Sequence, residues 1–524
     1  MTHALGLLLS PASTSPSNGA AEFPFNQPSA DIILRSSDHV DFHVHHSILA
    51  QASHIFADML SIPQPQNEER IRNQCLPDVD LVEDSKTLRR LLLLCYPVNK
   101  PELEPLEDIV PVLRAATKYV MEWPITLITR NLLSLVPSKP FRVWAVACEA
   151  GLDTVAQQAA QQLVVATQAT SSNDKRAPFR TERDLLKGVS AGDYFRLLAL
   201  LHLSFPYRNC PLRSLSPVSS SLPSKYHEPS PLHFIPYDPA PDVTLLCADG
   251  VEISAHRLIL TLCIPKLLES LKNGSPLPVL SVDAKSYILI DLLHVCYKGS
   301  DNLPFDASGL AAFWMTSKRY DAHSLCKAAR RRWDSVATLR PIEAYFAAIH
   351  NELGEQIVHD AAKRTLASIM TGVYAPSMEH CTAQAYDRLL DYHSECARAV
   401  SEELQRVSMY VADMATPPCR KPFERREGET AWAALAWLQG RLAKAFHDVA
   451  DGARAPARIL VDFEASALLV AAARERKTSA QPDDSWNSVD FSTFVRIVLE
   501  VEGALRAGVE SAISSVSVRG SVPR

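Results

Sequence analysis

Residues 31–49 read DIILRSSDHVDFHVHHSIL, and residues 242–260 read DVTLLCADGVEISAHRLIL. The two stretches align without a gap at a constant shift of 211 positions. Where the residues differ, apolar and polar character is often kept. The identical pairs include Asp31 with Asp242, His45 with His256, and Leu49 with Leu260. Self-similarity of this kind indicates two copies of one structural unit.

A second block repeats at a shift of 201, from Leu76 to Tyr96 in the first copy and from Leu277 to Tyr297 in the second. The difference of ten positions falls in the Pro- and Gln-rich stretch 63–75, and loops tolerate such changes of length. Later matches reach the pair YFRLL at 194–198 and YDRLL at 386–390. The repeat therefore extends beyond one small domain core.

The residue pattern predicts the same order of elements in both copies. Alternating apolar residues predict a strand at 31–35, a polar turn, and a second strand at 40–44. Helical spacing then predicts one helix from Ile48 to Leu60. We expect a short strand at 77–81, after which Ser85 caps a helix from Lys86 to Cys95. A further helix is predicted at 107–120.

This order, with an Asp before the first strand, a His at the strand-to-helix junction and a Leu four residues later, resembles the BTB/POZ family. The first copy also has Ser53 as the family often does, whereas the second has Ile264. Two copies on one chain are similar to fungal BTB-domain proteins. The resemblance implies protein-interaction domains and six structural signature residues: Asp31, His45, Leu49, Asp242, His256 and Leu260. We expect both histidines to pack at the junction and to hydrogen-bond backbone.

The predicted fold class is α+β, with two tandem BTB/POZ-like units, each followed by helices that resemble a degenerate BACK region, and a helical C-terminal tail. The expected divisions are a disordered N-terminus at 1–27, BTB/POZ-like domain one at 28–136, helical extension one at 137–205, a Pro- and Ser-rich linker at 206–238, BTB/POZ-like domain two at 239–340, helical extension two at 341–400, and a helical region of unknown role at 401–524.

Composition argues against several classes of protein. The formal net charge of -6 gives no electrostatic reason to expect nucleic-acid binding. No apolar run approaches the roughly 20 residues of a membrane span, so we expect no membrane partner. The 11 cysteines form no CxxC pair and are expected to be free and mostly buried, which fits an intracellular, cytoplasmic or nuclear protein.

The sequence contains no pattern that indicates catalysis or a cofactor. It has no P-loop, GxGxxG, HExxH, GxSxG or EF-hand motif. His43, His45 and His46 lie on both faces of a strand and lack a complete ligand set, so we expect no metal. We predict that Arg330–Arg332 form a solvated helix face and that Trp432 and Trp437 pack in a core. The chain is therefore predicted not to be an enzyme.

The leading functional hypothesis is a scaffold or adaptor that binds other proteins, with self-association or intramolecular pairing of the two units. The alternative is a substrate adaptor of a cullin-RING ubiquitin ligase, for which the family uses an apolar-x-Glu motif after the third core helix. The first copy lacks this motif at 61–67, and Leu267-Leu-Glu269 fits its letters but is expected within a helix. An enzyme in the C-terminal region is a third hypothesis, which no residue pattern supports.

Overall fold

The computed structural model describes residues 19–61, 76–99, 101, 106–169, 177–202, 240–269, 279–367, 373–415, 425–450, 455–478 and 491–518. The predicted linker at 206–238 lies outside these residues, as do residues 1–18 of the predicted disordered N-terminus. Residues 19–27 of that terminus, in contrast, are folded onto the first copy, where the Phe25 side chain is fully buried.

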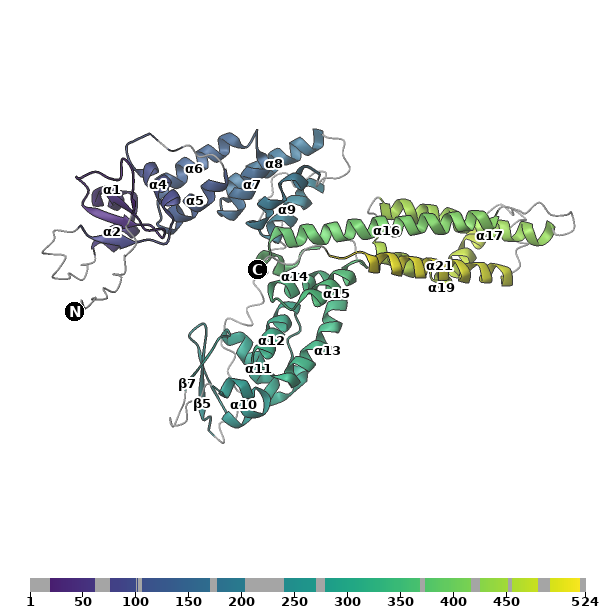
Figure 1. The fold of residues 1–524 in the computed structure, drawn as a ribbon. Coiled ribbons are helices and arrows are strands. Elements are labelled where there is room, and N and C mark those ends of the chain that lie inside the picture. The colour runs from purple at the N-terminus through teal and green to yellow at the C-terminus, as the bar shows by residue number, and fades with distance from the viewer. Residues whose placement is uncertain are drawn as a thin grey trace, which may run out of the picture. The chain divides into compact units, whose positions relative to one another are not determined.

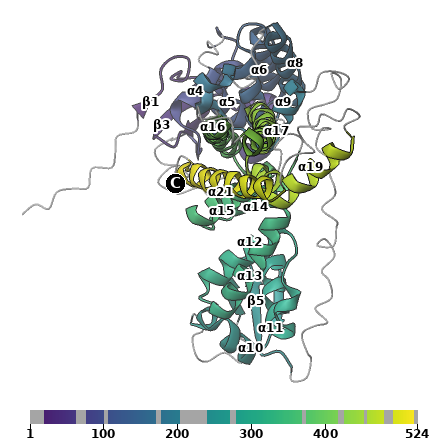
Figure 2. The same cartoon turned by 90° about the vertical axis from the view of Figure 1, so that its right-hand side faces the viewer.

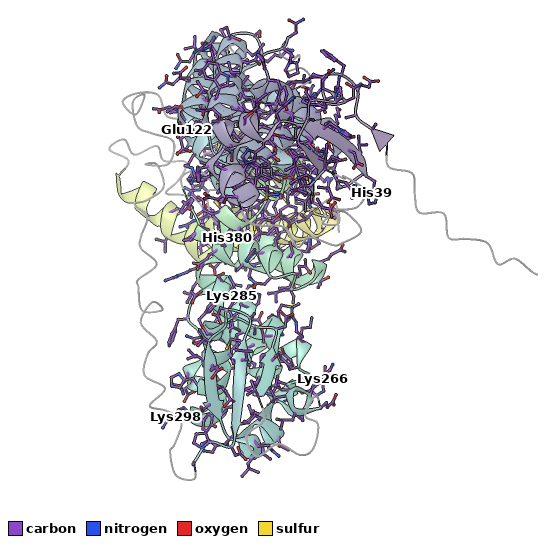
Figure 3. The ribbon with its side chains drawn as sticks, turned by 90° about the vertical axis from the view of Figure 1, so that its left-hand side faces the viewer. His39, Glu122, Lys266, Lys285, Lys298 and His380 are labelled. Carbon is purple, nitrogen blue, oxygen red and sulfur yellow. The ribbon has the colours of Figure 1, made fainter. Side chains whose placement is uncertain are left out.

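The first copy begins with a mixed four-stranded sheet in the order β1-β3-β2-β4. Strands β2 (Ile32–Arg35) and β3 (Val40–Val44) form the predicted antiparallel hairpin. Strand β1 (Gly19–Ala20) pairs in parallel with β3, and β4 (Asp78–Asp80) pairs in parallel with β2. His39 lies at the hairpin tip with a φ of 61° (Figure 3). Alternate residues of the hairpin are buried, namely Ile32 and Leu34 on β2 and Phe42 and Val44 on β3, and they provide one side of the core.

The prediction of a single helix after β3 is wrong. Two helices, α1 (His46–Ala52) and α2 (His54–Ser61), are separated at Ser53. Ser53 has an extended backbone, with φ -154° and ψ 122°. Its buried hydroxyl donates to the Tyr119 carbonyl and accepts from the Phe56 amide. Within the described residues, three further helices complete the domain core of this copy: α4 (Ser85–Cys95), α5 (Ile109–Lys118) after the short turn η1 (Leu106–Asp108), and α6 (Glu122–Leu135).

The second copy has the same order around a three-stranded sheet, β6-β5-β7, within the described residues. Its strands are β5 (Val243–Cys247), β6 (Glu252–Ala255) and β7 (Val279–Val282). Its helices are α10 (Arg257–Cys263), η5 (Pro265–Leu268), α11 (Ser286–Lys298), η6 (Ser300–Asn302), α12 (Ala307–Arg319) and α13 (His323–Leu339). Figure 2 shows α10, α11 and α13 gathered around β5.

Helices follow the domain core of each copy, as the sequence predicts. The first set is α7 (Pro140–Glu149), α8 (Asp153–Ala169), η2 (Ala177–Lys187) and α9 (Ala191–His202). The second is α14 (Pro341–His350), α15 (Glu355–Thr365), η7 (Pro376–His380) and α16 (Ala383–Ala415). The turns between α7 and α8 and between α14 and α15 contain Gly151 and Gly354 at positive φ, a conformation that glycine adopts without steric cost.

The C-terminal region is helical, as predicted, but the expected boundary at residue 400 falls inside the 33-residue helix α16. Helices α16, α17 (Arg425–Ala450) and α21 (Phe491–Ser515) run side by side (Figure 1). Along the sequence, η8 (Pro456–Arg458), α18 (Ile459–Asp462) and α19 (Ala465–Thr478) lie between α17 and α21. Among the described helices, none is long and apolar enough to cross a membrane.

The chain divides into two compact units. Unit one contains residues 1–189 and 200–212, and unit two contains residues 190–199 and 213–524. The first part of α9 therefore packs within unit two, although it belongs to the first copy of the repeat. The predicted α+β class is confirmed.

Candidate functional site

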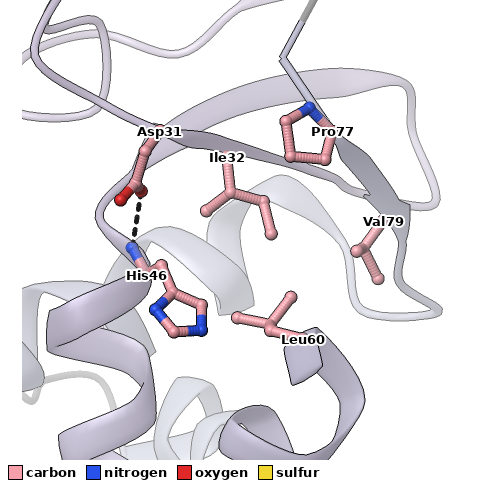
Figure 4. Close-up of a pocket in the computed structure, with 6 residues that line it drawn as sticks. All are labelled: Asp31, Ile32, His46, Leu60, Pro77 and Val79. Atoms are coloured by element: carbon pink, nitrogen blue, oxygen red, sulfur yellow. Dashed lines mark hydrogen bonds between the residues drawn. The ribbon is translucent and has the colours of Figure 1, made fainter. Parts of the chain in front are cut away.

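The aspartate before the first strand of each copy accepts a hydrogen bond from the start of the first helix. Asp31 Oδ1 accepts a hydrogen bond from the His46 amide at 2.6 Å, and Asp242 Oδ1 accepts one from the Arg257 amide, also at 2.6 Å. A carboxylate at a helix N-terminus satisfies a free amide and interacts favourably with the helix dipole. Figure 4 shows the Asp31 contact beside a small hollow lined by Ile32, His46, Leu60, Pro77 and Val79.

The side chain of each of the two repeated histidines contacts a tyrosine at the strand-to-helix junction. The Tyr96 hydroxyl lies 3.2 Å from His45 Nδ1 and accepts the His45 amide at 2.8 Å. Tyr297 meets His256 in the same way, at 2.7 Å and 3.0 Å. Burial raises the pKa of both tyrosine hydroxyls above the usual value. The sequence alignment matched the two tyrosines but gave no sign of this contact.

A third repeated contact ties the hairpin turn to the following helix. Asp38 accepts the Ser85 amide at 2.8 Å and the Ser85 hydroxyl at 2.6 Å. Asp249 accepts the same two groups of Ser286, at 3.0 and 2.7 Å. Hydrogen bonds from Ser36 and Ser85 lower the pKa of Asp38 to about 2. Ser85 is therefore not the predicted cap; the Asp84 side chain caps α4 by accepting the Thr87 amide.

Three of the six signature residues lie at the strand-to-helix junction of each copy. Leu49 and Leu260 have no exposed surface. His45 is occupied by Tyr96 and, through Nε2, by Ser29 at 3.0 Å. Among the described residues, no group of three or more His, Cys, Asp or Glu side chains could hold a metal ion. The described contacts of the junctions therefore join sheet to helix.

The outer faces of the first helices differ between the copies. On α10, Leu258 and Leu262 are 69% and 71% exposed, whereas the matching positions on α1 are the exposed Ser47 and Gln51. Two leucines four residues apart form one apolar stripe on a helix. Ile264, which stands where the first copy has Ser53, is buried and does not belong to this stripe. In the alignment of the two copies, Leu258 matches Ser47, and this difference could have indicated the stripe from the sequence.

The sequence also singled out three arginines on α13 and two tryptophans in the C-terminal region. Arg330 and Arg331 on α13 are exposed, as predicted, and Arg332 is half-buried. Arg330 also lies over the Trp314 ring at 5.5 Å and Arg332 over the Phe305 ring at 4.8 Å. In the tail, Trp437 packs beside Phe494 with ring centroids 6.0 Å apart, and the Trp432 side chain lies outside the described residues.

Comparison with protein families identifies the repeated unit. The family model described as BTB/POZ domain matches residues 24–134 and, separately, residues 238–333. No curated protein and no solved structure matches the chain significantly. BTB/POZ domains are protein-interaction modules. The chain thus carries two domains of the BTB/POZ family, one in each copy of the repeat.

Proposed function

We propose that this protein is an intracellular scaffold or adaptor that associates with other proteins through its two BTB/POZ domains. The observation that carries this proposal is the separate match of the domain family to each copy. The polar groups that the copies share are used to join sheet and helices, which supports binding and not catalysis as the role of these domains. Under this proposal the chain is not an enzyme.

The second domain is the stronger candidate for self-association. Members of this family commonly dimerise through their first core helices, and here only α10 presents an apolar stripe on that helix, Leu258 and Leu262. Burial of apolar surface is worth about 25 cal/mol per Å², so two leucines in one contact contribute appreciably to association. The matching Ser47 and Gln51 of the first domain offer little apolar surface.

The test compares matched double variants of the full chain by light scattering after size exclusion. We expect the molar mass of the wild type to rise with concentration, and Leu258→Glu with Leu262→Glu to abolish that rise. The control, Ser47→Glu with Gln51→Glu, should behave as the wild type. Since all four side chains are exposed, both variants should keep the wild-type circular dichroism. Equal mass curves for the wild type and the leucine variant would remove α10 from the proposal.

A substrate adaptor for a cullin-RING ligase is the second candidate. Glu269 follows the last residue of η5 and is exposed, which favours its availability, but Leu267 is only 5% exposed. Direct pulldown of a purified cullin with the wild type and with Glu269→Ala distinguishes this role. Binding that Glu269→Ala abolishes would support it, and no cullin binding by the wild type would refute it.

A further inference from the structure

Segments that correspond to each other in the two copies meet inside unit two. The sequence match of 194–198 with 386–390 has a shift of 192, which also pairs Ser190 with Thr382. Ser190 and Thr382 form an antiparallel β-bridge. The rings of Tyr194 and Tyr386 lie 6.1 Å apart at 79°. Contacts between equivalent residues are the mark of a twofold interface, here formed within one chain.

The contact has a buried apolar centre. From the first copy, Ala191, Tyr194 and Leu197 are fully buried, and Phe195 is nearly so. Phe195 contacts two aromatic rings of the second copy, Tyr374 at 5.7 Å and Tyr386 at 6.0 Å. The Ala191 amide also donates to the Cys381 carbonyl at 2.7 Å. Well-packed aromatic side chains of this kind dominate the energy of protein interfaces.

A buried arginine links the two segments. Arg196 is 3% exposed and contacts Glu379 with both terminal nitrogens, at 3.2 Å for Nη2 to Oε2. Asp193 accepts from Arg196 Nη2 at 2.6 Å, and the Tyr374 hydroxyl donates to Glu379 at 2.6 Å. Although burial opposes ionisation, these hydrogen bonds and the Arg196 charge hold the pKa of Glu379 below its usual value. Breaking such a pair leaves a buried charge without its partner.

The charges make the pairing asymmetric. At the shift of 192, the position in the first copy that corresponds to Glu379 is Lys187. Two first copies paired in this way would therefore place Arg196 opposite a lysine. Gly192 adds a steric requirement, because a Cβ there would lie 2.3 Å from Oε1 of Glu379. Its counterpart in the second copy is Gln384. These differences favour pairing of a first copy with a second copy.

We propose that residues 190–199 form an interaction surface whose partner is residues 374–390 of the second copy, so that the two halves of this chain stay bound without a covalent link. This contact lies outside both BTB/POZ domains and is independent of the proposed function. The experiment therefore cuts the purified full chain at a protease site inserted between Ser219 and Ser220, in the predicted linker. We expect the cut wild type to elute as one complex, at the volume of the uncut chain.

Variants of the cut chain test the charge pair. Arg196→Glu should weaken the association by at least about 100-fold, and Arg196→Glu with Glu379→Arg should restore part of it. Arg114→Glu is the matched control, because Arg114 is exposed and pairs with Glu149 inside unit one. Gly192→Val should also weaken the complex by displacing the Glu379 carboxylate.

Each outcome bears on the proposal. Separation or precipitation of the halves of the cut wild type at micromolar concentration would overturn it. Continued co-elution of the cut Arg196→Glu variant would show that the ion pair does not hold the halves together. Hydrogen exchange on the uncut chains provides a second measurement: amides at 190–199 should exchange faster in Arg196→Glu and at the wild-type rate in Arg114→Glu. Unchanged exchange in Arg196→Glu would contradict the assigned contact.

Discussion

Identity between the two copies marks residues that join elements of one domain. Asp31, His45 and Asp38 each have a counterpart with the same kind of partner at the same position. The exposed first-helix positions have instead diverged, as Leu258 and Ser47 illustrate. The sequence could predict the buried leucines from helical spacing. It could not predict the His45 partner, because Tyr96 is brought to it by the fold from 51 positions away.

At the scale of single residues, the burial of Leu260 gives a direct prediction. Leu260→Asp places a carboxylate at a position with no exposed surface and should lower the free energy of unfolding of the second domain by more than about 3 kcal/mol. Leu49→Asp should do the same in the first domain. Urea denaturation of the full chain, followed by hydrogen exchange in each domain, measures both effects.

The control uses the same helix and the same new side chain. Leu258→Asp changes a leucine that is 69% exposed, so it should cost no more than about 0.5 kcal/mol. If Leu260→Asp and Leu258→Asp proved equally stable, the packing assigned to α10 would be wrong.

At the scale of elements, the strands were predictable and several helix ends were not. Alternation fixed the hairpin of each copy, because one face of the sheet is buried. Apolar spacing continues through Ser53, so it could not show that α1 ends there and α2 begins. Ser and Asp are both common cap residues, so the sequence alone could not decide between Ser85 and Asp84. In the structure the Ser85 hydroxyl donates to Asp38 in the turn between β2 and β3, and the Asp84 carboxylate caps the helix.

The break at Ser53 should depend on its hydroxyl. Ser53→Ala removes the bond to the Tyr119 carbonyl and the cap on the Phe56 amide, and both bonds are buried. We expect a loss of about 1 to 3 kcal/mol in the free energy of unfolding. Ser61→Ala, in an exposed position on α2, is the control and should change stability by less than about 0.5 kcal/mol. Chemical denaturation of both variants measures the difference, and equal midpoints would argue against the cap.

At the scale of the whole molecule, the tandem arrangement could be predicted from the sequence, because the matching residues occur in the same order over a long stretch of both copies. The placement of residues 190–199 in unit two was not, because the match of 194–198 with 386–390 gives equivalence and not contact. Likewise, continuous helical periodicity concealed where the second extension passes into the tail, since α16 spans both. Sequence periodicity reports the face that a helix buries, but it does not report the partner.

The last prediction concerns how the two BTB/POZ domains associate, and it rests on the proposed function. Joining two domains on one chain raises the effective concentration of each near the other to about the millimolar range. We therefore expect pairing within a chain to precede pairing between chains at low concentration. An equal mixture of unlabelled and nitrogen-15-labelled chains, treated with an amine cross-linker at dilution, tests this. Lys86 and Lys118 serve in the first domain, and Lys266 and Lys298 serve in the second, where both project outward (Figure 3). Links between these pairs should carry one label only. Because an equal mixture pairs the two labels at random, core-to-core links that join unlike labels as often as like labels would show an ordinary homodimer in place of the intramolecular pair.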